Sequence, residues 1–150
     1  MLLYLDNCCF NRPYDDQSHY RVNLETQAKL YIQEKILLKQ YDLVWSYILQ
    51  FENDQNPHLA HKVEIAKWKH QSKILLPPSD EIIANAKHYQ TMGLRVKDAL
   101  HCACAVAAKA DYFLTTDKQL IKKAASIPEI TAINPLRFIE IEEEINHENR

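Results

Sequence analysis

Four carboxylates stand where segments expected to be regular structure begin or end. Asp6 directly follows one apolar run and Asp117 another, while Glu52 lies about two helical turns beyond a third run. Asp98 opens a helix that is apolar over most of its circumference. If the apolar runs are parallel strands of one sheet, their carboxyl ends form the crevice where ligands bind. The four side chains are then expected to converge there from separate segments.

Carboxylates crowded into one cleft repel one another. Two unit charges about 4 Å apart interact by roughly 4 kcal/mol at an effective dielectric constant of 20. Such groups must protonate or separate unless a cation holds them. Hard oxygen ligands with few imidazoles favour Mg²⁺ or Mn²⁺. The four carboxylates together therefore predict a divalent-cation site.

Each carboxylate also has a purely structural explanation. Asp117 suits the N-cap of a helix, and Asp98 suits a first-turn position that the helix dipole favours. Asp6 suits an Asx turn, and Glu52 suits a solvated helix face. For each residue taken singly the structural explanation is favoured, so the prediction of a site depends on all four.

The elements that position these residues alternate between strands and helices. Buried strands are expected at residues 2–5, 43–45, 112–115 and 130–133, and residues 74–76 form either a short strand or a connector. Helices are expected over residues 18–40, 47–53, 58–73, 79–92, 96–110 and 117–125. Such alternation predicts an α/β fold, a parallel sheet with helices on both faces.

The helix expected over residues 18–40 shows an amphipathic pattern. Its buried face is predicted to carry Tyr20, Leu24, Ala28, Tyr31, Ile32 and Ile36, which recur at three-to-four spacing. Its solvated face is predicted to carry Arg21, Glu25, Lys29 and Glu34. Further along the chain, Gly93 is expected at the left-handed C-cap position of a helix.

Other polar residues carry weaker signals. His101 lies one turn after Asp98, where it either orients that carboxylate or is a satisfied core histidine. The second interpretation is favoured, because one histidine without a partner is no metal signature. His58 and His61 are expected on the surface. The lysines that follow Asp117 either contact phosphates or form a solvated face, and they are Lys118, Lys122 and Lys123.

Composition excludes several classes of protein. The chain has 150 residues and a net charge of −2, which favours one domain and gives no support to a globally basic nucleic-acid binder. The domain is expected to span residues 1–139, followed by a polar acidic tail over residues 140–150. Gly93 is the single glycine, which excludes the glycine-rich loops that bind nucleotide phosphates in the usual ways.

Cysteine usage and hydropathy predict the location. Cys8, Cys9, Cys102 and Cys104 lack the spacing of a structural zinc site, so reduced thiols are expected. No apolar run approaches the roughly 20 residues that span a bilayer. The first six residues lack the basic region of a signal peptide, and a cytoplasmic protein without membrane contact is expected.

Four segments, in order, resemble the PIN-domain family. They are Leu3-Tyr4-Leu5-Asp6, Ser46-Tyr47-Ile48-Leu49-Gln50-Phe51-Glu52, Asp98-Ala99-Leu100-His101 and Tyr112-Phe113-Leu114-Thr115-Thr116-Asp117. The likeness is closest to the VapC-like ribonuclease toxins of prokaryotic toxin–antitoxin pairs. It extends from Leu2 to about Phe138 and is most specific over residues 97–117.

The resemblance implies a Rossmann-like three-layer α/β/α sandwich with a mainly parallel sheet. It also implies Mg²⁺ or Mn²⁺ in an acidic pocket and endonucleolytic cleavage of RNA. The residues that match the family's acidic positions are Asp6, Glu52, Asp98 and Asp117, and Thr116 matches a nearby polar position. The partners that it implies are an RNA substrate, a small antitoxin that docks a helix on an apolar groove, and a second copy in a homodimer.

The chain departs from the family at two places. Lys118-Gln119 stand where many relatives carry further acids, and the loop over residues 8–16 is unlike that of typical toxins. Toxicity and substrate are therefore less well supported by the resemblance than nuclease chemistry.

Two other function classes compete with the nuclease. One is a non-catalytic PIN-like module that binds RNA or protein, which the presence of all four carboxylates disfavours. The other is a phosphatase or hydrolase with Asp6 as nucleophile, but Asp6-Asn7-Cys8 lacks the Asp-x-Asp pattern of such enzymes. Divalent-metal binding distinguishes the nuclease from the module, and trapping of a phosphoaspartate distinguishes the two enzymes.

Overall fold

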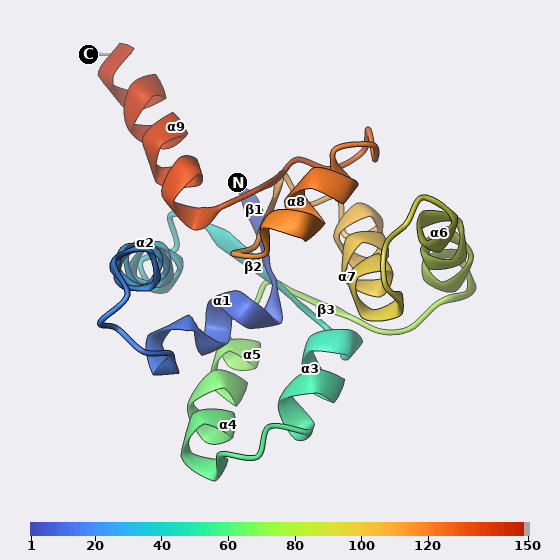
Figure 1. The fold of residues 1–150 in the computed structure, drawn as a ribbon, viewed down its shortest axis with the longest axis horizontal. Coiled ribbons are helices and arrows are strands. Elements are labelled where there is room, and N and C mark those ends of the chain that lie inside the picture. Colours follow the sequence, from blue (N-terminus) through green and yellow to red (C-terminus); the bar gives the residue numbers. More distant parts are fainter. Residues whose placement is uncertain (149–150) are drawn as a thin grey trace.

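Five parallel strands form the sheet of the computed structural model, which describes residues 1–148 (Figure 1). The strands are β1 (Leu2–Leu5), β2 (Asp42–Ser46), β3 (Ile74–Leu76), β4 (Tyr112–Leu114) and β5 (Ala132–Ile133). Their spatial order is β3-β2-β1-β4-β5, and all neighbours pair in parallel. The predicted parallel α/β fold is confirmed, and residues 74–76 form an edge strand.

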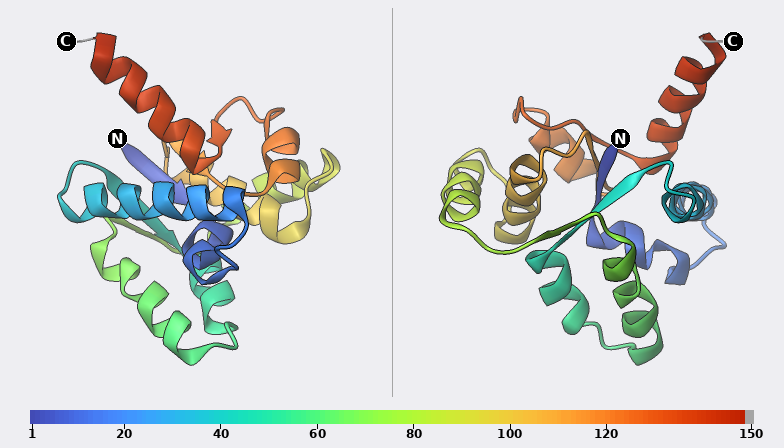
Figure 2. Two further views of the ribbon diagram at one scale, coloured as in Figure 1. Left: turned by 60° about the vertical axis from the view of Figure 1, so that its left-hand side comes forward. Right: turned by 180° about the vertical axis from the view of Figure 1, so that it is seen from behind.

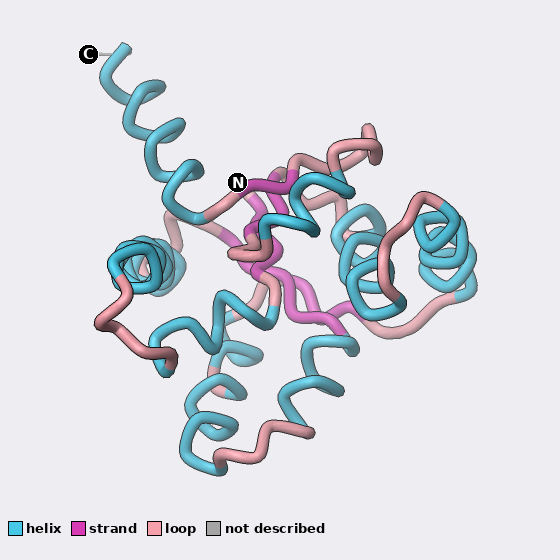
Figure 3. The backbone as a smooth tube through the Cα atoms, viewed as in Figure 1, coloured by secondary structure: helices cyan, strands magenta, loops and turns pink. Residues whose placement is uncertain are grey.

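Helices cover both faces of this sheet, so the fold has three layers. The helices are α1 (Asn7–Asn11), the 3₁₀ helix η1 (Arg12–Tyr14), α2 (Tyr20–Leu37), α3 (Tyr47–Asp54), α4 (Leu59–Ala66), α5 (Trp68–Gln71), α6 (Asp80–Thr91), α7 (Val96–Ala107), α8 (Lys118–Ala124) and α9 (Pro135–Glu148). α2 and α9 lie on one side of the sheet, and α6, α7 and α8 lie on the other (Figures 1 and 2). The strands run through the middle of the molecule (Figure 3).

Several elements are shorter than predicted. The single helix expected over residues 58–73 is divided at Lys67, which keeps helical backbone angles between α4 and α5. Lys39 and Lys109 adopt left-handed φ angles of 61° and 57°, and they end α2 and α7 before the predicted limits. Gly93, with a φ of 100°, follows the end of α6 as predicted. The last strand begins at Ala132 rather than at residue 130.

The buried face of α2 is rotated relative to the prediction. Tyr20 and Tyr31, expected in the core, are 81% and 42% exposed. Glu25 and Lys29, expected in solvent, are 0% and 5% exposed. Charged residues are almost never fully buried unless they are paired, so both require an explanation. The three residues of the predicted face that are buried are Ala28, Ile32 and Ile36.

Lys29 is buried against Phe10, with its ammonium 5.7 Å from the ring centroid. Burial lowers its pKa from 10.5 to about 8. At neutral pH the folded protein therefore carries a poorly solvated charge. Lys29→Met removes this charge and is expected to stabilise the protein by about 1–3 kcal/mol. The unfolded chain holds this proton up to about pH 10.5, whereas the folded chain releases it above about pH 8. The free energy of unfolding of the parent therefore rises with pH between about 8 and 10.5. The difference in stability between Lys29→Met and the parent should disappear over the same range.

Urea unfolding at about pH 7 and pH 10 tests this prediction, because the midpoint reports the change in free energy. Equal stability of parent and Lys29→Met at neutral pH would show that the ammonium is solvated.

The expected acidic tail continues a helix. Residues 140–148 belong to α9, so the boundary expected after residue 139 falls inside this helix. The first turns of α9 are anchored by Phe138, whose buried ring packs edge-on against Tyr41 and Tyr112 at 5.5 and 5.2 Å. The later turns project from the body of the molecule (Figure 1). The end of the expected tail, residues 149–150, lies outside the described residues.

Two further expectations concern the cysteines and the helices. All four cysteines carry free thiols, as predicted, and Cys8 is the one that is not fully buried. Within residues 1–148, no helix combines the length and the apolar character that crossing a membrane requires.

Candidate acidic site

Asp6 and Asp117 follow β1 and β4, which are neighbours in the centre of the sheet. The chain leaves β1 toward β2 on one side and leaves β4 toward β5 on the other, so the crevice of a parallel sheet is expected between them. The Asp6 N–H donates to the carbonyl of Leu114 at 2.9 Å, which holds the two strand ends together. Each carboxylate also caps a helix: Asp6 accepts from the N–H of Asn7 at 2.8 Å and Asp117 from that of Gln119 at 2.9 Å.

Glu52 and Asp98 reach the same place from helices. Glu52 lies on α3, which begins directly after β2, and Asp98 lies in the first turn of α7. All four carboxylates line one cavity of about 440 Å³, the acidic cavity. The other residues that line it are Asn7, Cys8, Asn11, Asp15, Lys97 and His101.

His101 joins the site to the core. Its Nε2 is hydrogen-bonded to Oε1 of Glu52 and lies 3.7 Å from Oδ1 of Asp6, and its Nδ1 is 2.6 Å from the hydroxyl of Tyr4. The histidine is buried and both ring nitrogens have partners, so the interpretation as a satisfied core histidine is confirmed. The carboxylates that it contacts are Glu52 and Asp6, whereas the sequence suggested Asp98.

A hydroxyl network continues from this histidine to the start of α3. The Tyr4 hydroxyl is 2.7 Å from Oγ of Ser46, and the same Oγ accepts from the N–H of Leu49 at 3.2 Å as the N-cap of α3. The Tyr4 ring is stacked on Phe113 at 5.2 Å. The helix that carries Glu52 and the ring that binds Glu52 are thus fixed by one buried network.

Burial and charge act in opposite directions on the Glu52–His101 pair. Burial tends to lower the pKa of His101, but the hydrogen bond to Glu52 and the charges of Asp6, Glu52 and Asp98 raise it above its ordinary value. Burial tends to raise the pKa of Glu52, but the hydrogen bond and charge of His101, helped by Lys97, lower it. Below the raised pKa of His101, its imidazolium and the Glu52 carboxylate therefore form an ion pair inside the site.

His101→Gln is expected to destabilise the metal-free protein by about 2 kcal/mol at acidic pH, because a hydrogen bond between charged groups is lost. A group whose pKa is raised by folding stabilises the fold fully when the pH is below its pKa in the unfolded chain, which is 6.5 for histidine. This contribution is lost as the pH rises through the pKa of the group in the folded chain. The cost of His101→Gln should therefore shrink at high pH.

Urea unfolding in EDTA at about pH 5.5 and pH 9 measures this difference. His88→Gln, at an exposed position on α6, is the matched control. A cost that is the same at both pH values would contradict the ion pair.

Asp98 behaves differently from Glu52. Burial and the charges of Asp6 and Asp117 raise its pKa, although His101 and Arg95 partly offset them. The site therefore contains uncompensated repulsion between carboxylates, which a cation would relieve. Within residues 1–148, no three His, Cys, Asp or Glu side chains are arranged closely enough to hold one ion by themselves.

The hydroxyl beside the carboxylates comes from Thr115, one residue before the predicted Thr116. Thr115 Oγ1 donates to Oδ2 of Asp6 at 2.9 Å and accepts from the N–H of Asp117 at 3.1 Å. Thr116 is buried and donates its backbone N–H to Sγ of Cys8 at 3.4 Å. Thr115 thus links the segments that carry Asp6 and Asp117.

Sequence reasoning missed other residues that line the acidic cavity. Asp15 adds a carboxylate from the loop after η1, and Lys97 adds a positive charge from the first turn of α7. Lys97 directly precedes Asp98, and Asp15 lies in the loop noted as atypical, so both stood beside recognised signals. The three lysines predicted near the cleft are not among its lining residues.

The comparisons with known proteins support the fold. No protein-family model matches the chain, and no curated protein does. A solved structure that matches is the crystal structure of VapBC2 from Rickettsia felis bound to a DNA fragment from their promoter. The two chains are 16% identical with a TM-score of 0.55, and the match covers 89% of this chain and 98% of that chain. At this identity the likeness shows a shared PIN-like α/β fold.

Proposed function

We propose that this protein is a divalent-metal-dependent endoribonuclease that hydrolyses RNA phosphodiester bonds in the acidic cavity. One observation carries the proposal: four carboxylates from four separate segments line one cavity at the carboxyl end of a parallel sheet. Burial, together with the charges of Asp6 and Asp117, raises the pKa of Asp98 above its ordinary value. Ionisable groups perturbed in this way inside a cleft mark functional sites.

The donors fit Mg²⁺ or Mn²⁺, because both metals prefer hard oxygen ligands. Asp6, Asp98 and Asp117 would hold the ion directly or through water, since Mg²⁺ usually binds one or two carboxylates and keeps several waters. Held there, a divalent cation would supply an activated water as the nucleophile and stabilisation of the charge on the phosphate oxygens.

The chain's own residues position the reactants. Glu52 stays ionised because its pKa is lowered, and it is held by His101, so it is suited to orient the attacking water. Lys97 is exposed and lines the acidic cavity, so its ammonium is able to bind a phosphate of the substrate.

The VapBC2 likeness extends the proposal to a toxin held by an antitoxin. In that structure VapBC2 is bound to a DNA fragment from their promoter, and for this chain a small antitoxin is proposed as a partner. A homodimer remains a prediction from the family resemblance.

Incubation of a mixed RNA pool with purified protein tests the nuclease. Cleavage is expected with Mn²⁺ or Mg²⁺ and is expected to stop in EDTA. Cleavage that persists in EDTA would contradict the metal dependence. A folded protein that cuts nothing with either metal would favour the alternative, a non-catalytic PIN-like binding module.

A further inference from the structure

A second cavity, of about 360 Å³, opens beside the acidic cavity and shares part of its lining. The shared residues are Asn7, Asn11, Glu52 and Lys97. The second cavity is completed by Gln55, Asn56, Pro57 and His58. We call it the amide trough, because carboxamides make up half of its lining. It leads from Glu52 along α1 toward the start of α4.

The amides of the trough form a hydrogen-bonded chain with one direction. The N–H of His58 donates to Oδ1 of Asn56 at 3.0 Å, and Nδ2 of Asn56 donates to Oδ1 of Asn11 at 3.3 Å. Nδ2 of Asn11 donates to Oδ1 of Asn7 at 3.2 Å and to the backbone carbonyl of Asn7 at 3.0 Å. A backbone N–H only donates, so Oδ1 of Asn56 must be the acceptor at the His58 end, and the orientations of Asn11 and Asn7 follow from it.

These hydrogen bonds leave at least one donor or acceptor lone pair free on every amide. A carboxamide has two N–H donors and two acceptor lone pairs, so each asparagine keeps capacity for a further partner. Gln55 is exposed and adds a fourth carboxamide to the wall. Among the described residues of this wall, Pro57 alone is apolar. The trough is therefore suited to a flat polar ligand with its own donors and acceptors.

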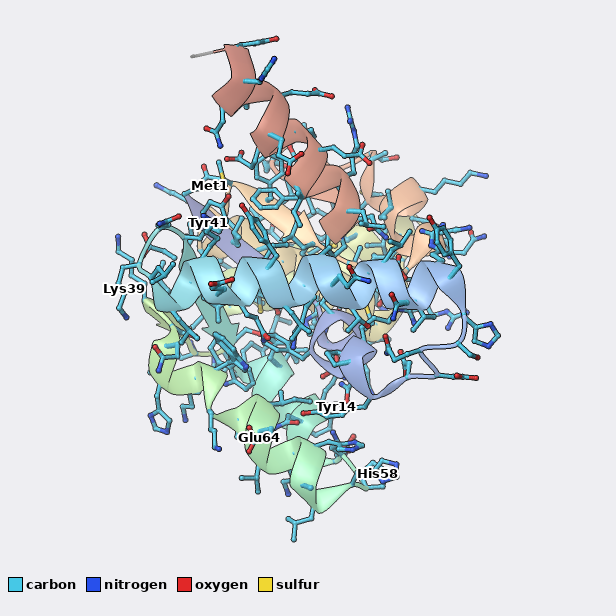
Figure 4. All side chains as sticks on the ribbon, turned by 90° about the vertical axis from the view of Figure 1, so that its left-hand side faces the viewer. Met1, Tyr14, Lys39, Tyr41, His58 and Glu64 are labelled. Atoms are coloured by element: carbon cyan, nitrogen blue, oxygen red, sulfur yellow. The ribbon has the colours of Figure 1, made fainter. Side chains whose placement is uncertain are left out.

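Aromatic rings stand at the far end of the trough. His58 is exposed, and its ring centroid is 4.9 Å from that of His61. His61 is stacked on Tyr14 at 3.8 Å with an interplanar angle of 8°, and Tyr14 is 42% exposed. Tyr14 and His58 project from neighbouring segments on the same edge of the molecule (Figure 4). Exposed flat rings of this kind stack with the bases of single strands.

We propose that the amide trough binds the nucleotide next to the scissile phosphodiester of a single-stranded RNA. The base lies against Gln55 and His58, and the free amide groups bond to its edge. Lys97, which lines both cavities, binds the phosphate that connects this nucleotide to the reacting one. The assignment rests on the proposed nuclease function.

The chemistry of the wall favours this ligand over others. Specific recognition of RNA targets unpaired bases, whose edges offer donors and acceptors together, and carboxamides match both. A docking protein helix needs an apolar groove, which the lining of this trough does not supply. In a duplex the base edges are paired, so a single strand is expected to bind better.

Binding is measured with the Asp98→Asn protein, so that cleavage is not required. The probe is a fluorescein-labelled single-stranded RNA hexamer of random sequence, followed by anisotropy at fixed salt. Gln55→Ala and His58→Ala are each expected to raise Kd about fivefold or more. The matched controls Gln90→Ala and His88→Ala, at exposed positions of α6, are expected to leave Kd unchanged.

Two outcomes would overturn the assignment. The first is an unchanged Kd in both trough variants, and the second is equal competition by an unlabelled RNA duplex and an unlabelled single strand. A probe that binds through the trough while the parent cuts no RNA would refute the nuclease, and the trough would then be a single-strand binding site with no scissile phosphodiester beside it. RNA cut by the parent, with Kd unaltered in the trough variants, would refute the trough and support the nuclease.

Discussion

Asp98→Asn is expected to reduce metal-dependent RNA cleavage by about a thousandfold or more, because a carboxylate that helps to hold the cation is lost. The same change is expected to raise the melting temperature of the metal-free protein. Asp98 is repelled by Asp6 and Asp117, and the neutral amide has nearly the same shape without the charge. Loss of activity with a gain in stability distinguishes a functional residue from a structural one.

Thermal melting in EDTA and in Mn²⁺ completes this test. The parent is expected to gain stability from Mn²⁺ through mass action, and Asp98→Asn is expected to gain much less. Asp80→Asn, in the exposed first turn of α6, is the matched control and should behave as the parent. Cleavage by Asp98→Asn at the parental rate would refute the assignment of Asp98.

For Asp6 and Asp117 the structural and functional explanations are compatible, whereas Glu52, expected on a solvated helix face, is only 16% exposed at its side chain and is hydrogen-bonded to the buried His101. Asp117 uses Oδ1 to cap α8. Asp6 uses Oδ1 for the N–H of Asn7 and Oδ2 for the hydroxyl of Thr115. A carboxylate offers about four lone-pair sites, so a capping oxygen is still able to bind a cation. Capping fixes the carboxylates at the strand ends, which is why the same residues fit both explanations.

The sheet was predictable because buried parallel strands are continuous apolar runs. Their parallel order then placed Asp6 and Asp117 at one edge without any knowledge of side-chain contacts. The buried face of α2 was not predictable in this way. Glu25 is buried because its charged partner Arg12 lies on η1, and a pattern within one helix carries no information about that contact.

The helix ends and the contacts within the site could not be predicted from the sequence for similar reasons. Lys39 and Lys109 end helices in left-handed conformations, where rules based on sequence expect glycine or asparagine. His101 binds Glu52, which is 49 residues away, so only the fold reveals the pair. The amide trough likewise joins Asn11 to Asn56, from segments that no local pattern connects.

The second large effect is expected on stability, from Glu25→Ala. Glu25 is 0% exposed, and its Oε1 accepts from the Arg12 guanidinium at 2.7 and 3.0 Å. Its Oε2 accepts from Arg21 at 3.2 Å and from Nδ2 of Asn134, the residue before α9. One carboxylate thus holds η1, α2 and the start of α9 together. Its removal takes this partner from Arg21, Asn134 and the partly buried Arg12, which keeps only Asp15 at 3.0 Å, and is expected to cost about 3–5 kcal/mol.

Urea unfolding at neutral pH measures this cost, with Glu34→Ala as the matched control at an exposed position of the same helix. The control is expected to change stability by no more than about 0.5 kcal/mol. Glu25→Gln keeps the shape of the side chain and part of its hydrogen bonding, so its cost should fall between the two. A cost for Glu25→Ala no larger than that for Glu34→Ala would show that the carboxylate is solvated. In that case the placement of Glu25 on the buried face of α2 would be wrong.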